Sequence, residues 1–139
     1  LQKIEQKNAL IPSVQIWATC KKQGSGNEYL LSLSTKALKN IAYKSLELNL
    51  ALIETNIPYE AINGDKIHYQ IFREFIKPTE ITETTGIPLS LQKTGDLFQT
   101  EFTFKLNSDL YKNDLSIICF VQDMETKSIL QGLEINLKP

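Results

Sequence analysis

Apolar and polar residues alternate along most of this chain, a period that is typical of β-strands with one buried face. The alternation is clearest over residues 98–106, where apolar side chains and one threonine share a face opposite polar ones: Phe98, Thr100, Phe102, Phe104 and Leu106 against Gln99, Glu101, Thr103 and Lys105. Leucines alternate in the same way over residues 46–52, and small or apolar residues do so over 14–20. These three segments predict strands that each turn one face toward a core.

A nearly continuous apolar run over residues 115–121 predicts a central strand, because the run is too short for an ordinary helix. The polar segment 124–128 has the right length for a hairpin connection to a returning strand over 129–137. Further strands over 28–38 and 67–76 bring the expected number to about seven, with turns or loops between them, which is typical of a β-sandwich.

The predicted fold class is therefore all-β, an antiparallel β-sandwich. Strands with one solvated face indicate antiparallel sheets, and parallel strands would need crossover helices for which the chain has no sequence. Asn63-Gly64 is a strong hairpin signal, and the Thr- and Glu-rich segment Pro78–Pro88 predicts a surface loop. The segment Lys36–Lys44 fits either a loop or a helical turn, and its periodicity does not decide between them.

The first dozen residues have a different pattern. Leu1 and Ile4 have helical spacing, and Pro12 stops any helix. We expect residues 1–12 to be a linker or the tail of an upstream element, with a disordered terminus as the alternative, and residues 13–139 to form the sandwich domain. The chain opens on leucine, not methionine, so we expect an excised segment whose native protein, with any signal peptide, begins upstream.

Composition narrows the function classes. The 139 residues suit a single domain, and they carry a net charge of −1 with no basic block, so we expect no nucleic-acid partner. No run approaches the roughly 18 apolar residues of a membrane span. With one histidine, no C-x-x-C pair and no nucleophile motif, we expect no catalytic residue, no cofactor and no metal site in this segment.

Three residues are candidates for a structural or anion-contact site: Glu54, His68 and Arg73. Strict alternation over 67–76 places Arg73 among apolar residues, so it needs an acidic partner or a bulge. Glu54 and Glu74 are the nearby acids. Paired with one of them at a sheet edge, Arg73 is structural, which we favour; in a cleft it would bind an anion. We expect His68 to be a solvated or hydrogen-bonded strand residue.

The same alternation assigns the faces of this strand. One face is mostly polar and the other mostly apolar apart from the arginine: His68, Gln70, Phe72 and Glu74 against Ile67, Tyr69, Ile71, Arg73 and Phe75. On the strand over 14–20, Trp17 lies opposite the apolar face. A partly exposed tryptophan there marks an interface, or it packs under a loop or an adjoining domain.

The two cysteines, Cys20 and Cys119, lie on the inward faces of their strands by alternation. Buried thiols behave as small hydrophobes with a raised pKa. An oxidising compartment would permit a disulfide, but Cys20 lies at a strand end and Cys119 deep in a central strand, and the pattern does not place them at one level. We therefore expect two free thiols.

Several short motifs occur in an order that resembles a known family. They are Ala51–Glu54, Asn63–Arg73, Gly86–Leu91, Phe120–Asp123 and Thr126–Gln131. Together they look like the C-terminal β-domain of the twenty-eight-kilodalton outer-membrane-protein family, exported bacterial proteins whose upstream part is similar to thioredoxin. The resemblance covers roughly residues 46–135.

The chain departs from the family pattern in places. Tyr69 stands where a second histidine is common, Gly132 stands where alanine is common, and the N-terminal third carries no family motif. None of the shared motifs is catalytic, so the resemblance carries no catalytic residue onto this chain.

The resemblance implies an Ig-like sandwich that acts as a non-catalytic accessory domain of an exported protein, in the periplasm or associated with the outer membrane. Its partner would be the upstream domain of the same chain or another envelope protein. The alternative is a stand-alone partner-binding or adhesion module of the cell envelope that uses its loops or an exposed edge strand. An enzyme in its own right has the least support from the residues.

Overall fold

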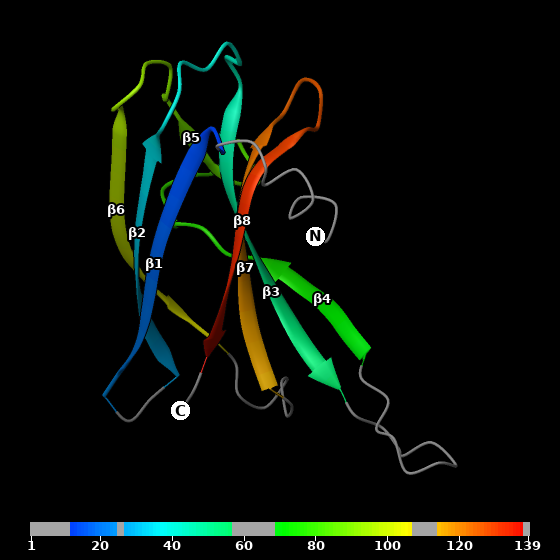
Figure 1. The fold of residues 1–139 in the computed structure, drawn as a ribbon. Coiled ribbons are helices and arrows are strands. Elements are labelled where there is room, and N and C mark those ends of the chain that lie inside the picture. The colour runs from blue at the N-terminus through cyan, green and yellow to red at the C-terminus, as the bar shows by residue number, and fades with distance from the viewer. Residues whose placement is uncertain (1–11, 25–26, 57–68, 107–113, 138–139) are drawn as a thin grey trace.

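The computed structural model describes residues 12–24, 27–56, 69–106 and 114–137. Within these residues the chain forms eight strands in two antiparallel sheets and no helix, so the prediction of an all-β sandwich is confirmed (Figure 1). The strands are β1 (Val14–Gln23), β2 (Glu28–Ala37), β3 (Leu46–Asn56), β4 (Tyr69–Phe75), β5 (Ile87–Leu89), β6 (Leu97–Lys105), β7 (Asp114–Asp123) and β8 (Ile129–Leu137). None of the described segments is a helix long and apolar enough to cross a bilayer.

The two sheets have different strand orders. Sheet A has the order β1-β2-β6, and sheet B has the order β4-β3-β7-β8, with β5 paired to the start of β3 and β4 to its end. The sheets approach each other where β1 and β8 lie side by side (Figure 1). At this junction Gln131 donates a long side-chain hydrogen bond, of 3.5 Å, to the carbonyl oxygen of Val14.

The core lies between the sheets and consists of the alternating positions that the pattern predicted. The leucines of β3 are buried together with residues of β2 and β7: Leu46, Leu48, Leu50 and Leu52 with Leu31, Leu33, Ile117, Cys119 and Val121. Because antiparallel pairing keeps a period of two on both strands, Leu50 is opposite Cys119 and both face the core. Each fully buried leucine contributes about 1.5–3 kcal/mol of hydrophobic stabilisation.

The segment predicted as the surface loop Pro78–Pro88 is only partly a loop, because its last residues begin β5. Ile87 and Leu89 are buried, while Pro88 between them is exposed. Gly86 holds the loop against β3, where its N–H donates to Glu47 Oε1 at 3.1 Å. A Cβ at this position would collide with the side chain of Asn49 and would lie 2.7 Å from the carbonyl oxygen of Leu48, so the close approach requires glycine.

The segment Lys36–Lys44 is strand and loop, and the helical alternative is wrong. β2 continues to Ala37, whose N–H donates to the carbonyl oxygen of Asp96 at 2.8 Å. Ile41, buried, donates its N–H to the carbonyl oxygen of Gln92 at 2.7 Å. Because these backbone bonds go to the loop before β6, they satisfy groups that a helix would have paired within itself.

Two aspartates organise the loops through their carboxylates. Asp123, at the end of β7, accepts hydrogen bonds at Oδ2 from Thr126 Oγ1 (2.5 Å) and Thr126 N (2.9 Å), and these bonds hold its pKa below the ordinary value. Asp96 accepts at Oδ2 from the backbone N–H groups of Lys93 and Gln92, both at 2.9 Å, which lowers its pKa in the same way. The charged form of each carboxylate is therefore favoured by the fold.

Candidate functional site

Strand β4 contains a β-bulge at Arg73. Phe75 is opposite Ala51 and Glu74 is opposite Leu52, but the next pair is Phe72 with Ile53, so Arg73 has no Cα partner on β3. The bulge corrects the face assignment made from strict alternation, because one extra residue reverses the faces beyond it. Phe72 and Phe75 therefore pack against each other, with ring centroids 4.8 Å apart and the ring planes tilted by 56°, instead of lying on opposite faces.

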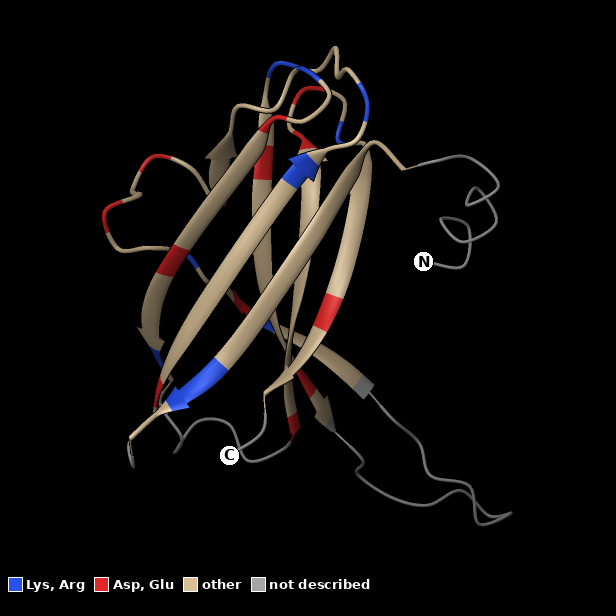
Figure 2. Cartoon of the chain, turned by 60° about the vertical axis from the view of Figure 1, so that its left-hand side comes forward, with Lys and Arg blue, Asp and Glu red and all other residues tan. Residues whose placement is uncertain are grey.

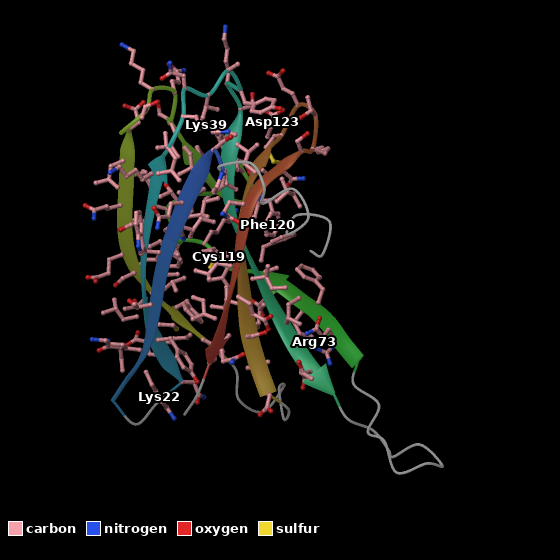
Figure 3. The ribbon with its side chains drawn as sticks, viewed as in Figure 1. Lys22, Lys39, Arg73, Cys119, Phe120 and Asp123 are labelled. Atoms are coloured by element: carbon pink, nitrogen blue, oxygen red, sulfur yellow. The ribbon has the colours of Figure 1, made fainter. Side chains whose placement is uncertain are left out.

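Arg73 forms an ion pair with Glu54, one of the two acids that the sequence analysis considered. Its Nε donates to Glu54 Oε1 at 2.7 Å, and its Nη2 lies 2.6 Å from the same oxygen. The carboxylate is buried, with 2% of its side chain exposed, whereas 37% of the arginine side chain is exposed. Figure 3 shows Arg73 beside strands β3 and β4. Arg73 thus has both a partner and a bulge, and it places its cation at the rim of the sheet.

His68, the third candidate, lies outside the described residues, so its expected role stays a prediction. Among the described residues, no group of three or more His, Cys, Asp or Glu side chains could hold a metal ion. What the structure shows at Arg73 and Glu54 is an ion pair between strands β4 and β3, and its expected structural role stays a prediction.

The two cysteines are free, as predicted. Burial raises the pKa of Cys20 to about 11 and that of Cys119 to about 12, and the nearby Cys20 thiol adds to the second shift. The alternation pattern did not place the two cysteines at one level, and their strands belong to different sheets, yet Cys20 is near enough to contribute to the pKa of Cys119. A thiol with so high a pKa is almost wholly protonated near neutrality and is a poor nucleophile.

A second candidate site lies on the outer face of sheet A, and the sequence analysis found only one of its residues, Trp17. A shallow hollow of about 440 Å³ is lined by residues of β1, β2 and β6: Trp17, Ala18, Thr19, Ser32, Leu33, Ser34, Gln99, Thr100 and Glu101. The indole of Trp17 is 46% exposed. In the part of the chain that the structure describes, no loop covers the tryptophan, and the interface and the adjoining-domain interpretations both stay predictions.

Strand pairing brings the outward-facing residues of this hollow into two rows. Trp17 is opposite Ser34, which is opposite Gln99 on the next strand. In the adjacent row, Thr19 is opposite Ser32, which is opposite Glu101. The signal that could have found the site is a tryptophan on a polar strand face, followed by a strand whose outward positions are serines.

Hydrogen bonds tie the rows together across β2 and β6. Gln99 Nε2 donates to Ser34 Oγ at 3.2 Å, and Ser32 Oγ donates to Glu101 Oε2 at 2.7 Å. Figure 2 shows the lysine and arginine colour at the ends of β1 and β2, whereas the middle of sheet A has one acidic segment, on β6. The hollow therefore combines apolar surface with hydroxyl and amide groups, and its lining includes one carboxylate and one exposed aromatic ring.

Comparison with known proteins shows that the chain resembles two solved structures in fold. No family model and no curated protein sequence matches the chain. Among solved structures, a domain of the outer membrane lipoprotein Omp28 from Porphyromonas gingivalis is similar with a TM-score of 0.61 and 15% identity, over 94% of this chain and 92% of that one.

The sporulation control protein Spo0M from Bacillus subtilis is similar with a TM-score of 0.64 and 15% identity, over 91% of this chain but 49% of that chain. At this level of identity, both likenesses concern the fold: the chain has the β-sandwich of these two proteins.

Proposed function

We propose that this chain is a non-catalytic accessory domain of an exported bacterial envelope protein. The observation that carries the proposal is the end-to-end likeness to a domain of an outer membrane lipoprotein, which extends over more than nine-tenths of both chains. The ordered motifs between residues 46 and 135 support the same assignment, because they resemble the β-domain of the twenty-eight-kilodalton outer-membrane-protein family.

In this proposal residues 1–12 connect the domain to an upstream element, and residues 13–139 form the domain itself. The described surface supports a binding role, since the hollow on sheet A is open to solvent and is lined by hydroxyl and amide groups beside an exposed tryptophan. The ion pair of Arg73 and Glu54 and the two protonated thiols are structural in this scheme. Any thiol–disulfide chemistry of the parent protein would reside in a thioredoxin-like domain upstream.

Cell fractionation of the full-length gene product tests the location. A tagged full-length product expressed in its native host should be recovered with the periplasmic or outer-membrane fraction. Recovery in the cytosolic fraction alone, with markers of each compartment correctly distributed, would contradict the proposal.

The alternative is a stand-alone partner-binding or adhesion module of the cell envelope, and the exposed Trp17 hollow is the observation that favours it. The complete gene product distinguishes the two functions. A thioredoxin-like stretch with a C-x-x-C motif before this domain supports the accessory role, whereas tandem copies of the sandwich without such a stretch support the adhesion role.

A further inference from the structure

The hollow on sheet A has the form of a trough, because its central strand carries small side chains. Ser32 and Ser34 of β2 lie between larger residues on both neighbouring strands. Trp17 lies on the β1 side, and Gln99 and Glu101 lie on the β6 side. Since adjacent strands are about 4.8 Å apart, the two sides of the trough are separated by roughly 10 Å.

Serine is an unusual residue at the outward positions of a central strand. Outward positions of a middle strand gain most from β-branched and aromatic residues, which pack against both neighbours. Two successive outward serines leave the indole of Trp17 uncovered on its β2 side, and they place hydroxyl groups along the floor. Departures of this kind from local preference are expected at functional sites.

The chemistry of the trough selects its ligand. The exposed face of an indole offers a flat apolar surface. Around it, the hydroxyls of Thr19, Ser32 and Ser34 and the amide of Gln99 can each donate and accept hydrogen bonds. A matching ligand has a flat C–H face and edges rich in hydroxyl groups, which describes a sugar ring.

The charge of the trough excludes other ligands. Glu101 repels phosphates and acidic sugars, and among the described residues no lysine or arginine lines the trough to offset it. A lipid or an apolar peptide would bury the serine, threonine and glutamine groups without hydrogen bonds, at a cost. We propose that the trough on sheet A binds an uncharged saccharide chain, with Trp17 as the stacking platform.

The internal hydrogen bonds hold the site ready for such a ligand. Gln99 is fixed by its bond to Ser34, and Glu101 by the bond that it accepts from Ser32. Each oxygen keeps further acceptor capacity toward a ligand. Because these side chains are held before binding, less conformational entropy is lost when the ligand binds. The proposal rests on the binding role proposed above, but not on the export of the protein.

Trp17 is the only tryptophan of the chain, so its emission reports directly on the trough. The 139-residue chain is titrated with four uncharged hexasaccharides (cellohexaose, chitohexaose, maltohexaose and xylohexaose) up to millimolar concentration. We expect a saturable change of emission with at least one of them. The absence of a response to all four overturns the proposal.

Two variants and a matched control locate the binding. Ser34→Leu fills the floor beside the indole and should abolish the response. Trp17→Ala, followed by titration calorimetry, should weaken binding by at least roughly tenfold, the worth of one good aromatic contact. Tyr43→Ala removes an exposed aromatic from the loop before β3 and should leave the affinity unchanged. Undiminished binding by Ser34→Leu, or equal weakening by Tyr43→Ala, overturns the assignment to the trough.

Circular dichroism of every variant excludes unfolding as the cause of a lost response. An emission change produced by a proline decapeptide, but by none of the saccharides, would assign the trough to a protein partner and overturn the saccharide proposal. The fractionation experiment is independent of these results. Saccharide binding by a protein found in the cytosol would refute export alone, and envelope location without binding would refute the trough alone.

Discussion

The ion pair between Arg73 and Glu54 leads to an asymmetric prediction. Arg73→Met replaces the aliphatic stem with an apolar chain of similar length and removes the charged guanidinium, which leaves the Glu54 carboxylate buried without this counter-charge. Glu54→Gln instead leaves the guanidinium of a side chain that is already 37% exposed and can be hydrated where it stands. Arg73→Met should therefore destabilise the domain more than Glu54→Gln, although both remove the same ion pair.

The burial of the two partners sets the size of the effect. Removing one partner of a fully buried pair costs about 3–5 kcal/mol, because the remaining charge stays desolvated. Solvent reaches the arginine side of this pair and can hydrate part of the carboxylate in the variant, so we expect about 2–3 kcal/mol for Arg73→Met. For Glu54→Gln we expect about 1 kcal/mol, the value of one hydrogen bond.

Urea denaturation followed by far-ultraviolet circular dichroism measures both free energies of unfolding. The double variant Arg73→Met/Glu54→Gln should be more stable than Arg73→Met alone, because it no longer buries a carboxylate that has lost the charge of Arg73. Lys36→Met, which removes an exposed cation from β2, is the matched control and should change the free energy of unfolding by no more than about 0.5 kcal/mol. If Arg73→Met is as stable as the wild type, or less damaging than Glu54→Gln, the reasoning is wrong.

Three further predictions concern the loops and the core. Gly86→Ala should cost about 1–3 kcal/mol in urea denaturation, since the new methyl group collides with Asn49, and an unchanged midpoint would show that the loop can move away. Because the fold lowers the pKa of Asp123, this carboxylate stabilises the protein above its ordinary pKa, and the stabilisation is lost as the pH falls through the lowered value. The melting temperature should therefore decrease when the pH is lowered from about 5 to about 3, and it should decrease less steeply in Asp123→Asn. In the native protein at neutral pH, Cys20 and Cys119 should react slowly with Ellman's reagent, and in denaturant both should react rapidly. Fast labelling of the native protein would contradict their raised pKa values.

The strands that could be predicted from the sequence are those whose pattern arises from residues close together in the chain. The alternation in β3 and β6 arises from side chains two residues apart, so it can be found without knowing which strands are neighbours. The short strand β5 was missed because it has three residues with a proline in the middle, and such a run has no period to detect. Its strand character depends on pairing with β3, distant in the sequence.

The site residues illustrate the same limit. The need of Arg73 for an acid could be predicted from its apolar surroundings, but the bulge depends on the register between β3 and β4, which the pattern does not contain. The trough needs a register across three strands, since Trp17, Ser34 and Gln99 meet only through two sets of strand pairs. Trp17 alone was visible as an exposed aromatic, without the serine floor that gives it a binding surface.

The bulge at Arg73 also affects how copies of this domain can assemble. β4 is an outer strand of sheet B, and an outer strand is a template on which a strand from another molecule can add. A residue that interrupts the regular spacing of N–H and C=O groups, and that carries a charge, makes this template a poor one. Crowded copies should thus resist joining into a continuous sheet through β4, and deletion of Arg73 would remove the interruption together with the ion pair, producing a domain that is both less stable and more prone to aggregate.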